Sequence, residues 1–196
     1  PSRKKFSHKK VVLLGPSHAG KTALALAIRH KKTIPTFPSL VATATPGVKL
    51  PDDPPNQPTL LLVDTPGSGN LRATTLGEAA DADVIACVLD GSRLAAQCAD
   101  AADILYDVLA LEPVARAAAP VLIVVNKSDV RAAGTEASVV SALEGELDRA
   151  RPSRTTLGDT RGGGTWAAGS ASRSRFSFGT SGHTVSFVRS SALDAP

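Results

Sequence analysis

The stretch GPSHAGKT at residues 15–22 decides the fold of this chain, because it separates an apolar run from a helical pattern. It has the form G-x-x-x-x-G-K-T and follows the apolar VVLL at residues 11–14. Glycines at both ends let such a loop curl until its backbone N–H groups face a phosphate, and a helix over 21–30 adds its positive end. A chance turn could carry the same letters, but the order of strand, loop and helix favours a phosphate-binding loop.

The residue types of this loop predict how a nucleoside triphosphate would be held. Lys21 would reach the β- and γ-phosphates, and the hydroxyl of Thr22 would be a ligand of Mg²⁺. The remaining predicted nucleotide-binding residues of the loop are Gly15, Ser17, His18, Ala19 and Gly20.

The string NKSD at residues 126–129 predicts which base is bound. It follows the apolar residues 120–125, which are typical of a buried parallel strand, and ligands bind at the carboxyl ends of such strands. The carboxylate of Asp129 can accept two hydrogen bonds from guanine, whereas adenine lacks that pair of donors. A polar turn is the alternative for so short a string, but its place at a strand end favours a guanine site that also uses Asn126 and Lys127.

Between these motifs, LLLVDTPG at residues 60–67 has the D-x-x-G form at the end of another apolar run. Asp64 would hold Mg²⁺ through water, and the N–H of Gly67 would touch the γ-phosphate. Asp-Thr-Pro-Gly is also an ordinary β-turn sequence, and both interpretations hold together because the turn presents the amide.

The order of these motifs resembles that of Ras-like small GTPases over most of the chain. Residues 64–72, DTPGSGNLR, are similar to the D-L-P-G-x-x-x-L-R of the signal recognition particle receptor beta subunit family, as are a polar insertion before the last strand and a basic amino end. The resemblance implies that Ser191 and Ala192 lend backbone amides to guanine. It also implies an Arf-like GTPase on the cytosolic face of the endoplasmic reticulum membrane, whose GTP-bound form binds the amino-terminal domain of the receptor alpha subunit.

Strand and helix patterns alternate along the chain and predict a single α/β domain. The sequence is expected to form a Ras-like P-loop GTPase fold, with a mainly parallel six-stranded sheet and helices on both faces. Strands are expected over 11–15, 59–64, 84–90, 120–126 and 183–189, with an antiparallel edge strand near 46–50. Helices are expected over 21–30, 71–80, 93–110 and 134–150.

The two ends of the sequence and one long polar stretch are expected to depart from the regular alternation of strands and helices. Residues 1–10 carry five basic residues and no acid, and we interpret them as a juxtamembrane segment before a GTPase domain over 11–196. Residues 152–183 are expected to be a flexible insertion, because their composition is polar. The chain starts at Pro1 and lacks Met, so we expect a fragment without its membrane helix; the helix that usually closes the fold is expected to be truncated or disordered.

Composition restricts the partners. The net charge of +4 and pI near 9.3 would suit RNA, but only 4% of residues are aromatic, so a stacking platform and direct RNA binding are not expected. Cys87 and Cys98 lack metal-ligand spacing and do not form a disulfide framework, which favours a cytosol-facing chain.

The segment 34–46 is predicted to be the switch that senses the γ-phosphate. A hydroxyl there should reach Mg²⁺, and the candidates are Thr36, Ser39, Thr43 and Thr45. Ser39 is assigned to the metal and the nucleotide, because its Pro-Ser-Leu setting resembles the Pro-Thr-Ile of Arf-like GTPases. Capping of turns is the alternative for these hydroxyls.

Ser68 follows the D-x-x-G glycine, where related GTPases usually place a glutamine that orients the attacking water. Serine is too short for this task, so the chain is predicted to hydrolyse GTP slowly by itself. Two functions remain open: a GTP-dependent binding module, or a cycling GTPase that receives its missing group from a partner. An ATP-driven P-loop enzyme is disfavoured by Asp129.

Overall fold

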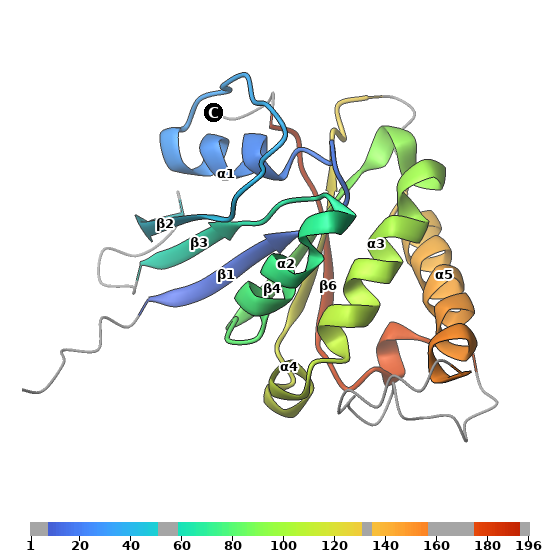
Figure 1. Cartoon of the computed structure of the whole chain (residues 1–196). Coiled ribbons are helices and arrows are strands. Elements are labelled where there is room, and N and C mark those ends of the chain that lie inside the picture. Colours follow the sequence, from blue (N-terminus) through green and yellow to red (C-terminus); the bar gives the residue numbers. More distant parts are fainter. Residues whose placement is uncertain (1–7, 51–58, 131–134, 157–174, 193–196) are drawn as a thin grey trace, which may run out of the picture.

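The computed structural model describes residues 8–50, 59–130, 135–156 and 175–192 (Figure 1). Its centre is a six-stranded sheet in the order β2-β3-β1-β4-β5-β6. β2 runs antiparallel to β3, and the other neighbouring strands are parallel. The predicted fold class is therefore confirmed.

Most element bounds follow the apolar patterns closely, but the edge strand β2 is largely exposed and begins three residues before the expected 46–50. The strands are β1 (Lys9–Leu14), β2 (Thr43–Val48), β3 (Leu60–Asp64), β4 (Val84–Asp90), β5 (Val121–Asn126) and β6 (Val185–Arg189). The α-helices are α1 (Lys21–His30), α2 (Arg72–Ala79), α3 (Leu94–Leu109), α4 (Glu112–Ala117) and α5 (Glu136–Thr156). Short 3₁₀ turns are η1 (Gly69–Leu71), η2 (Gly91–Arg93) and η3 (Phe178–Thr180).

Helices cover the two faces of the sheet, and each face has its own core. On one face, Leu24 and Ile28 of α1 pack with a buried cluster that includes Leu13 and Val124. On the other face, α2, α3 and α5 lie together (Figure 1), and the larger core there contains Leu105 of α3. Burial on both faces explains why the central strands are continuous apolar runs.

The strand register brings polar residues together at one edge. Asp64 ends β3 opposite Leu13 of β1, and Asp90 ends β4 opposite Asn126 of β5. These strands are parallel, so their carboxyl ends meet at the edge where ligands bind in such sheets. The motifs found in the sequence therefore converge on this edge.

The start of the domain differs from the expected bounds. β1 begins at Lys9, so the last two residues of the predicted basic segment 1–10 belong to the sheet. The ammonium of Lys10 pairs with Glu78 at 2.9 Å and also with Asp81, because β1 passes beside the end of α2. This corrects the prediction of a wholly juxtamembrane segment, whose residues 1–7 lie outside the described residues.

The predicted insertion 152–183 is also narrower than expected. α5 continues to Thr156, and the part of the range at 157–174 lies outside the described residues. The side chains of Phe176 and Phe178 are buried and meet edge to face, with ring centroids 5.4 Å apart. The N–H of Phe178 donates to Glu144 of α5 at 2.8 Å. Aromatic burial outweighs the polar composition here, so this end of the range is part of the core.

One further element differs from the sequence-based prediction, because the short helix α4 was not predicted. Arg72 of α2 pairs with Asp107 of α3 at 2.6 Å and is partly buried. Across the described residues, the helices lack the combination of length and apolar character that crossing a membrane requires.

Candidate nucleotide-binding site

The phosphate-binding loop joins β1 to α1, and its two glycines are required by close contacts. Gly15 has a φ of 137°, and an added Cβ would lie 2.2 Å from the carbonyl oxygen of Val88. Gly20 has a φ of 89°, and its Cβ would lie 2.3 Å from Nδ2 of Asn126. Only glycine fits either position, which is why both ends of the motif are glycine.

Lys21 is held inside this loop. Its ammonium donates to the carbonyl oxygens of Gly15 and Pro16, both at 2.9 Å, and the residue is 5% exposed. Burial lowers the pKa of Lys21, while the charge of Asp64 acts in the opposite direction. An ammonium has three donors, so one remains that could reach a phosphate.

Thr22 and Asp64 form the part of the site that suits a magnesium ion. The Thr22 hydroxyl donates to Oδ2 of Asp64 at 2.6 Å. Within the described residues, the buried Oδ1 of Asp64 has no hydrogen-bond partner. Burial raises the pKa of this carboxyl, although the Thr22 hydroxyl and the Lys21 charge oppose the rise. A hydroxyl and an orphaned carboxylate oxygen are the oxygen groups that Mg²⁺ and its bound waters take, so the residues fit the ion.

Gly67 lies directly against these phosphate-binding groups. An added Cβ would be 2.6 Å from both the Lys21 ammonium nitrogen and the Ser17 backbone nitrogen. The D-x-x-G backbone therefore shares the site with the loop, and a side chain at this position would occupy the same space.

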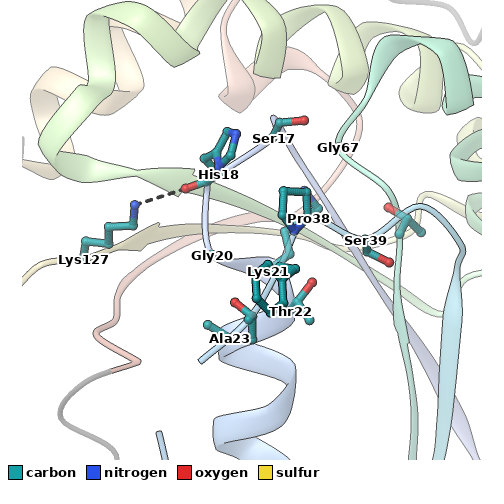
Figure 2. Close-up of a pocket in the computed structure, with 13 residues that line it drawn as sticks. Ser17, His18, Gly20, Lys21, Thr22, Ala23, Pro38, Ser39, Gly67 and Lys127 are labelled. Atoms are coloured by element: carbon teal, nitrogen blue, oxygen red, sulfur yellow. Dashed lines mark hydrogen bonds between the residues drawn. The ribbon is translucent and has the colours of Figure 1, made fainter. Parts of the chain in front are cut away.

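A cavity of about 270 Å³ opens beside the loop (Figure 2). Ser39 lines this cavity, and its hydroxyl donates to the carbonyl of Val41 at 2.6 Å. Thr36 lines it as well, whereas Thr43 and Thr45 are part of β2. The full lining is Ser17, His18, Gly20, Lys21, Thr22, Ala23, Thr36, Phe37, Pro38, Ser39, Thr65, Gly67 and Lys127.

The predicted guanine motif meets the loop at its other side. Asn126 is buried and donates from Nδ2 to the carbonyl of Ala19 at 2.9 Å. Its Oδ1 is a second buried acceptor without a partner among the described residues. Lys127 has a positive φ of 57° and donates to the carbonyl of His18 at 3.1 Å. Asp129 is exposed and does not line the 270 Å³ cavity.

The loop after β6 lies beside the guanine motif, as the position of Ser191 and Ala192 predicts. The N–H of Ser128 donates to the carbonyl of Ser190 at 3.0 Å. The Thr33 hydroxyl, just after α1, donates to the carbonyl of Ala192 at 2.8 Å. The structure thus brings the motif and this loop together, at one end of the phosphate site.

Sequence reasoning missed Asp90 and Gln97, which also reach the loop region. Asp90 is 1% exposed, and burial alone would raise its pKa. Hydrogen bonds and charge from Lys127, with hydrogen bonds from Ser92, outweigh burial and leave the pKa below its ordinary value. Asp90 ends a buried strand, as Asp64 does, and that position was an available signal.

Ser68 lines a second cavity, of about 390 Å³, which shares Gly67 with the first. Arg93 and Asp100 of the η2–α3 segment contribute to its wall. The full lining is Pro16, Ser17, His18, Gly67, Ser68, Gly69, Arg93, Ala96, Gln97 and Asp100. A side chain from another molecule would have room here next to the D-x-x-G turn.

This sheet order, with a glycine-bounded loop, a D-x-x-G turn and an N-K-x-D strand end at one edge, defines a P-loop domain of the Ras-like GTPase class. The sequence pattern of the signal recognition particle receptor beta subunit family matches residues 6–187. The chain belongs to this family of GTP-binding small GTPases.

Individual relatives support this family assignment. The signal recognition particle receptor subunit beta of Dictyostelium discoideum is 34% identical over 145 residues, which are 74% of this chain. The chain spans about half of that relative's length, 48%. The mammalian receptor structure has a TM-score of 0.76 at 25% identity, covering 95% of this chain and 93% of its own. The Chaetomium thermophilum subunit with GDP and Mg has a TM-score of 0.66 at 27% identity, covering 94% and 90%.

Proposed function

We propose that this chain binds GTP with Mg²⁺ and serves as the nucleotide-dependent subunit of a signal recognition particle receptor. The observation that carries the proposal is the convergence of the 15–22 loop, the 64–67 turn and the 126–129 strand end at one sheet edge. Guanine nucleotide and magnesium occur together in a solved relative, and the residues here fit both.

Each end of the nucleotide has its proposed contacts. The triphosphate lies along the loop amides, with Lys21 on the β- and γ-phosphates and the Gly67 N–H on the γ-phosphate. Asp129 accepts the paired donors of guanine, and the amides of Ser191 and Ala192 face the guanine oxygen. Mg²⁺, when bound, would neutralise phosphate charge. Thr22 and Ser39 would hold it through their hydroxyls, and Asp64 would hold it through water.

The switch side of the site suits a partner that distinguishes nucleotide states. Ser39 lines the nucleotide cavity, while Phe37, Leu40 and Val41 beside it are 88%, 75% and 72% exposed. Contact of Ser39 with Mg²⁺ and the γ-phosphate would fix the position of these apolar side chains. An apolar surface fixed in this way favours binding of the receptor alpha subunit in the GTP state.

We further propose that the chain acts at the endoplasmic reticulum membrane, on its cytosolic face. Residues 1–7 contain Arg3, Lys4 and Lys5, which would meet anionic lipid after a membrane helix. The side chain of Lys10 forms ion pairs within the fold, so we do not include it among the lipid-binding residues. The GTPase domain, whose first strand begins at Lys9, then projects into the cytosol.

The alternative is an Arf-like regulatory GTPase that cycles with a partner-supplied activating group. The 390 Å³ cavity beside Ser68 supports this alternative, because a side chain from a partner could enter it and reach the D-x-x-G turn. In either case the isolated chain hydrolyses GTP slowly, because serine lacks the reach to orient water.

Purification of the chain with its bound nucleotide tests the proposal. We expect GTP or GDP with one Mg²⁺, and slow turnover that the amino-terminal domain of the alpha subunit leaves unchanged. Acceleration of turnover by that domain would favour the cycling alternative. Recovery of an adenine nucleotide would overturn the guanine assignment.

A further inference from the structure

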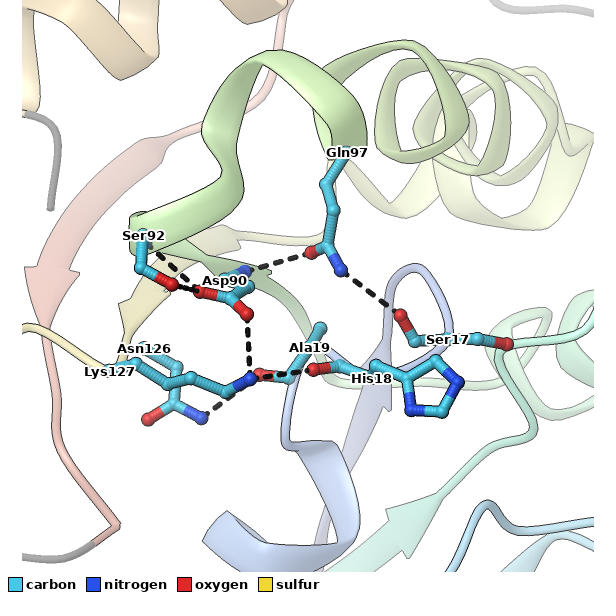
Figure 3. A network of polar contacts seen from close by, with 8 residues as sticks. All are labelled: Ser17, His18, Ala19, Asp90, Ser92, Gln97, Asn126 and Lys127. Atoms are coloured by element: carbon cyan, nitrogen blue, oxygen red, sulfur yellow. Dashed lines mark hydrogen bonds and ion pairs between the residues drawn. The ribbon is translucent and has the colours of Figure 1, made fainter. Parts of the chain in front are cut away.

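A hydrogen-bond network beneath the phosphate-binding loop includes two residues, Gln97 and Asp90, to which the functions described so far give no role (Figure 3). Three successive loop carbonyls, those of Ser17, His18 and Ala19, each accept from a side chain outside the loop. The donors are Gln97 Nε2 at 3.0 Å, Lys127 Nζ at 3.1 Å and Asn126 Nδ2 at 2.9 Å, respectively. They come from α3 and from the end of β5, far apart in sequence.

The direction of these carbonyls determines the direction of the loop amides. In a trans peptide the C=O and the following N–H point in opposite directions. With three carbonyls drawn outward, the N–H groups of His18, Ala19 and Gly20 must face the inside of the loop. The Ala19 N–H indeed reaches across the loop to the carbonyl of Pro16 at 3.4 Å. Inward amides are what a phosphate needs, so the outer bonds preorganise the site.

Asp90 links two of the three donors. Its Oδ2 pairs with Lys127 Nζ at 2.6 Å, and its Oδ1 accepts from the N–H and hydroxyl of Ser92 at 3.0 and 2.6 Å. Its backbone N–H donates to Oε1 of Gln97 at 2.9 Å. That last bond orients the Gln97 amide, so that Nε2 is the end that meets Ser17. One residue at the end of β4 therefore positions both a lysine and a glutamine.

The side chain of Gln97 is buried and bonded at both ends of its amide. It is 6% exposed, and its amide bonds to the end of β4 on one side and to the loop on the other. A buried glutamine that bonds to two backbone groups in this way fixes their spacing, because losing either bond leaves a buried polar group unpaired. Helix α3 and the loop are thereby held at one distance.

We propose that Gln97 and Asp90 are positioning residues of the phosphate site, which aim the loop amides at the β-phosphate without touching the nucleotide. The inference rests on the proposed GTP site. It predicts a selective effect: loss of Gln97 weakens ligands that carry the diphosphate and spares the nucleoside, whose contacts lie at Asp129 and the loop after β6.

The test compares GTP, GDP and guanosine binding to the full chain by calorimetry or competition. Gln97→Leu should weaken GTP and GDP about tenfold, the scale of one lost buried hydrogen bond, and leave guanosine within about twofold. Gln97→Glu keeps the size and the acceptor for Asp90 N–H, but sets an oxygen against the Ser17 carbonyl. Gln97→Glu should show the same selective loss of GTP and GDP affinity. It replaces Gln97→Leu as the test variant if Gln97→Leu fails to fold.

Ala99→Glu is the matched control for the added charge of Gln97→Glu, because Ala99 lies two residues further along α3, is exposed and lines neither cavity. It should bind all three ligands as the parent does. Unchanged GDP affinity in Gln97→Glu, or an equal loss of GDP and guanosine affinity in both variants, would overturn the positioning role. Failure of the parent chain to bind GDP would instead refute the proposed function.

Discussion

The two sides of the phosphate-binding loop differ in how they are held. On the side of the base, Asn126, Lys127 and Gln97 bind three loop carbonyls from outside. On the switch side, the Ser39 hydroxyl bonds within its own segment, to the carbonyl of Val41. Each side also has one buried acceptor without a partner among the described residues, Oδ1 of Asn126 and Oδ1 of Asp64. The comparison indicates that the loop backbone is positioned in advance, whereas the segment that senses the γ-phosphate is positioned by the ligand.

The largest expected effect on GTP affinity comes from substitution of Lys21. This residue is held by the loop carbonyls and is also proposed to bind the phosphates. Lys21→Ala should weaken GTP binding by more than about a hundredfold, since charge-assisted phosphate bonds are each worth about 1.5–3 kcal/mol. Equilibrium titration with a fluorescent GTP analogue measures this. Lys32→Ala removes an exposed lysine just after α1 and should bind like the parent; equal affinities for both variants would remove the loop from the mechanism.

Substitution of Asp129 tests recognition of the guanine base separately from binding of the phosphates. Asp129→Asn should lower GTP affinity by about thirtyfold and raise that for xanthosine triphosphate, because an amide donates where the carboxylate accepted. Competition between the two nucleotides gives the ratio directly. Guanosine should weaken in the same proportion as GTP, unlike in the Gln97 variants. A variant that still prefers GTP as strongly as the parent would contradict the guanine assignment.

The two buried carboxylates should respond oppositely to pH in the nucleotide-free chain. The folded pKa of Asp90 lies below its ordinary value of 3.8, so its stabilising effect is present above pH 3.8 and is lost as pH falls through the folded pKa. The folded pKa of Asp64 is raised, so its stabilising effect is present below pH 3.8 and is lost as pH rises through the folded pKa.

Chemical unfolding at pH 7 separates these cases. Asp90→Asn should lower the free energy of unfolding by about 1–2 kcal/mol, because it weakens the bond to Lys127. Asp64→Asn should leave it unchanged or raise it while abolishing the magnesium dependence of GTP binding. The same destabilisation in both variants would erase the difference between the two sides of the loop.

The smallest effect concerns hydrolysis. Ser68→Gln should raise the single-turnover rate severalfold without altering GTP affinity, because glutamine can orient water but no arginine is supplied with it. Ser68→Asn, with a side chain shorter by one methylene, is the matched control and should gain less. A parent chain that already turns over GTP within seconds would remove the basis of this prediction.

Local motifs allowed much of the site to be predicted from sequence. The loop, the D-x-x-G turn and the N-K-x-D end each combine a short pattern with an apolar strand, so their meeting at one sheet edge follows from a parallel fold. The assignments of individual residues to the nucleotide and the metal all stay predictions. Among them, Ser39 bonds to Val41 and Asp129 is exposed.

The features that could not be predicted from the sequence depend on contacts between residues that are far apart in the chain. Gln97 lies 80 residues from Ser17, and no local pattern marks their bond. Phe176 and Phe178 stand in a polar stretch, so composition predicted a loop, although two aromatic residues so close together indicate burial. The start of α4 carries a proline in its first turn, which is a helix signal.

Binding of the alpha-subunit domain in defined nucleotide states tests the central claim most directly. The chain, loaded with Mg²⁺ and either GDP or a non-hydrolysable GTP analogue, is titrated with the amino-terminal domain of the receptor alpha subunit. We predict tight binding in the GTP-like state and at least about tenfold weaker binding with GDP, because only the γ-phosphate can fix the segment around Ser39. Equal affinity in both states would contradict the account.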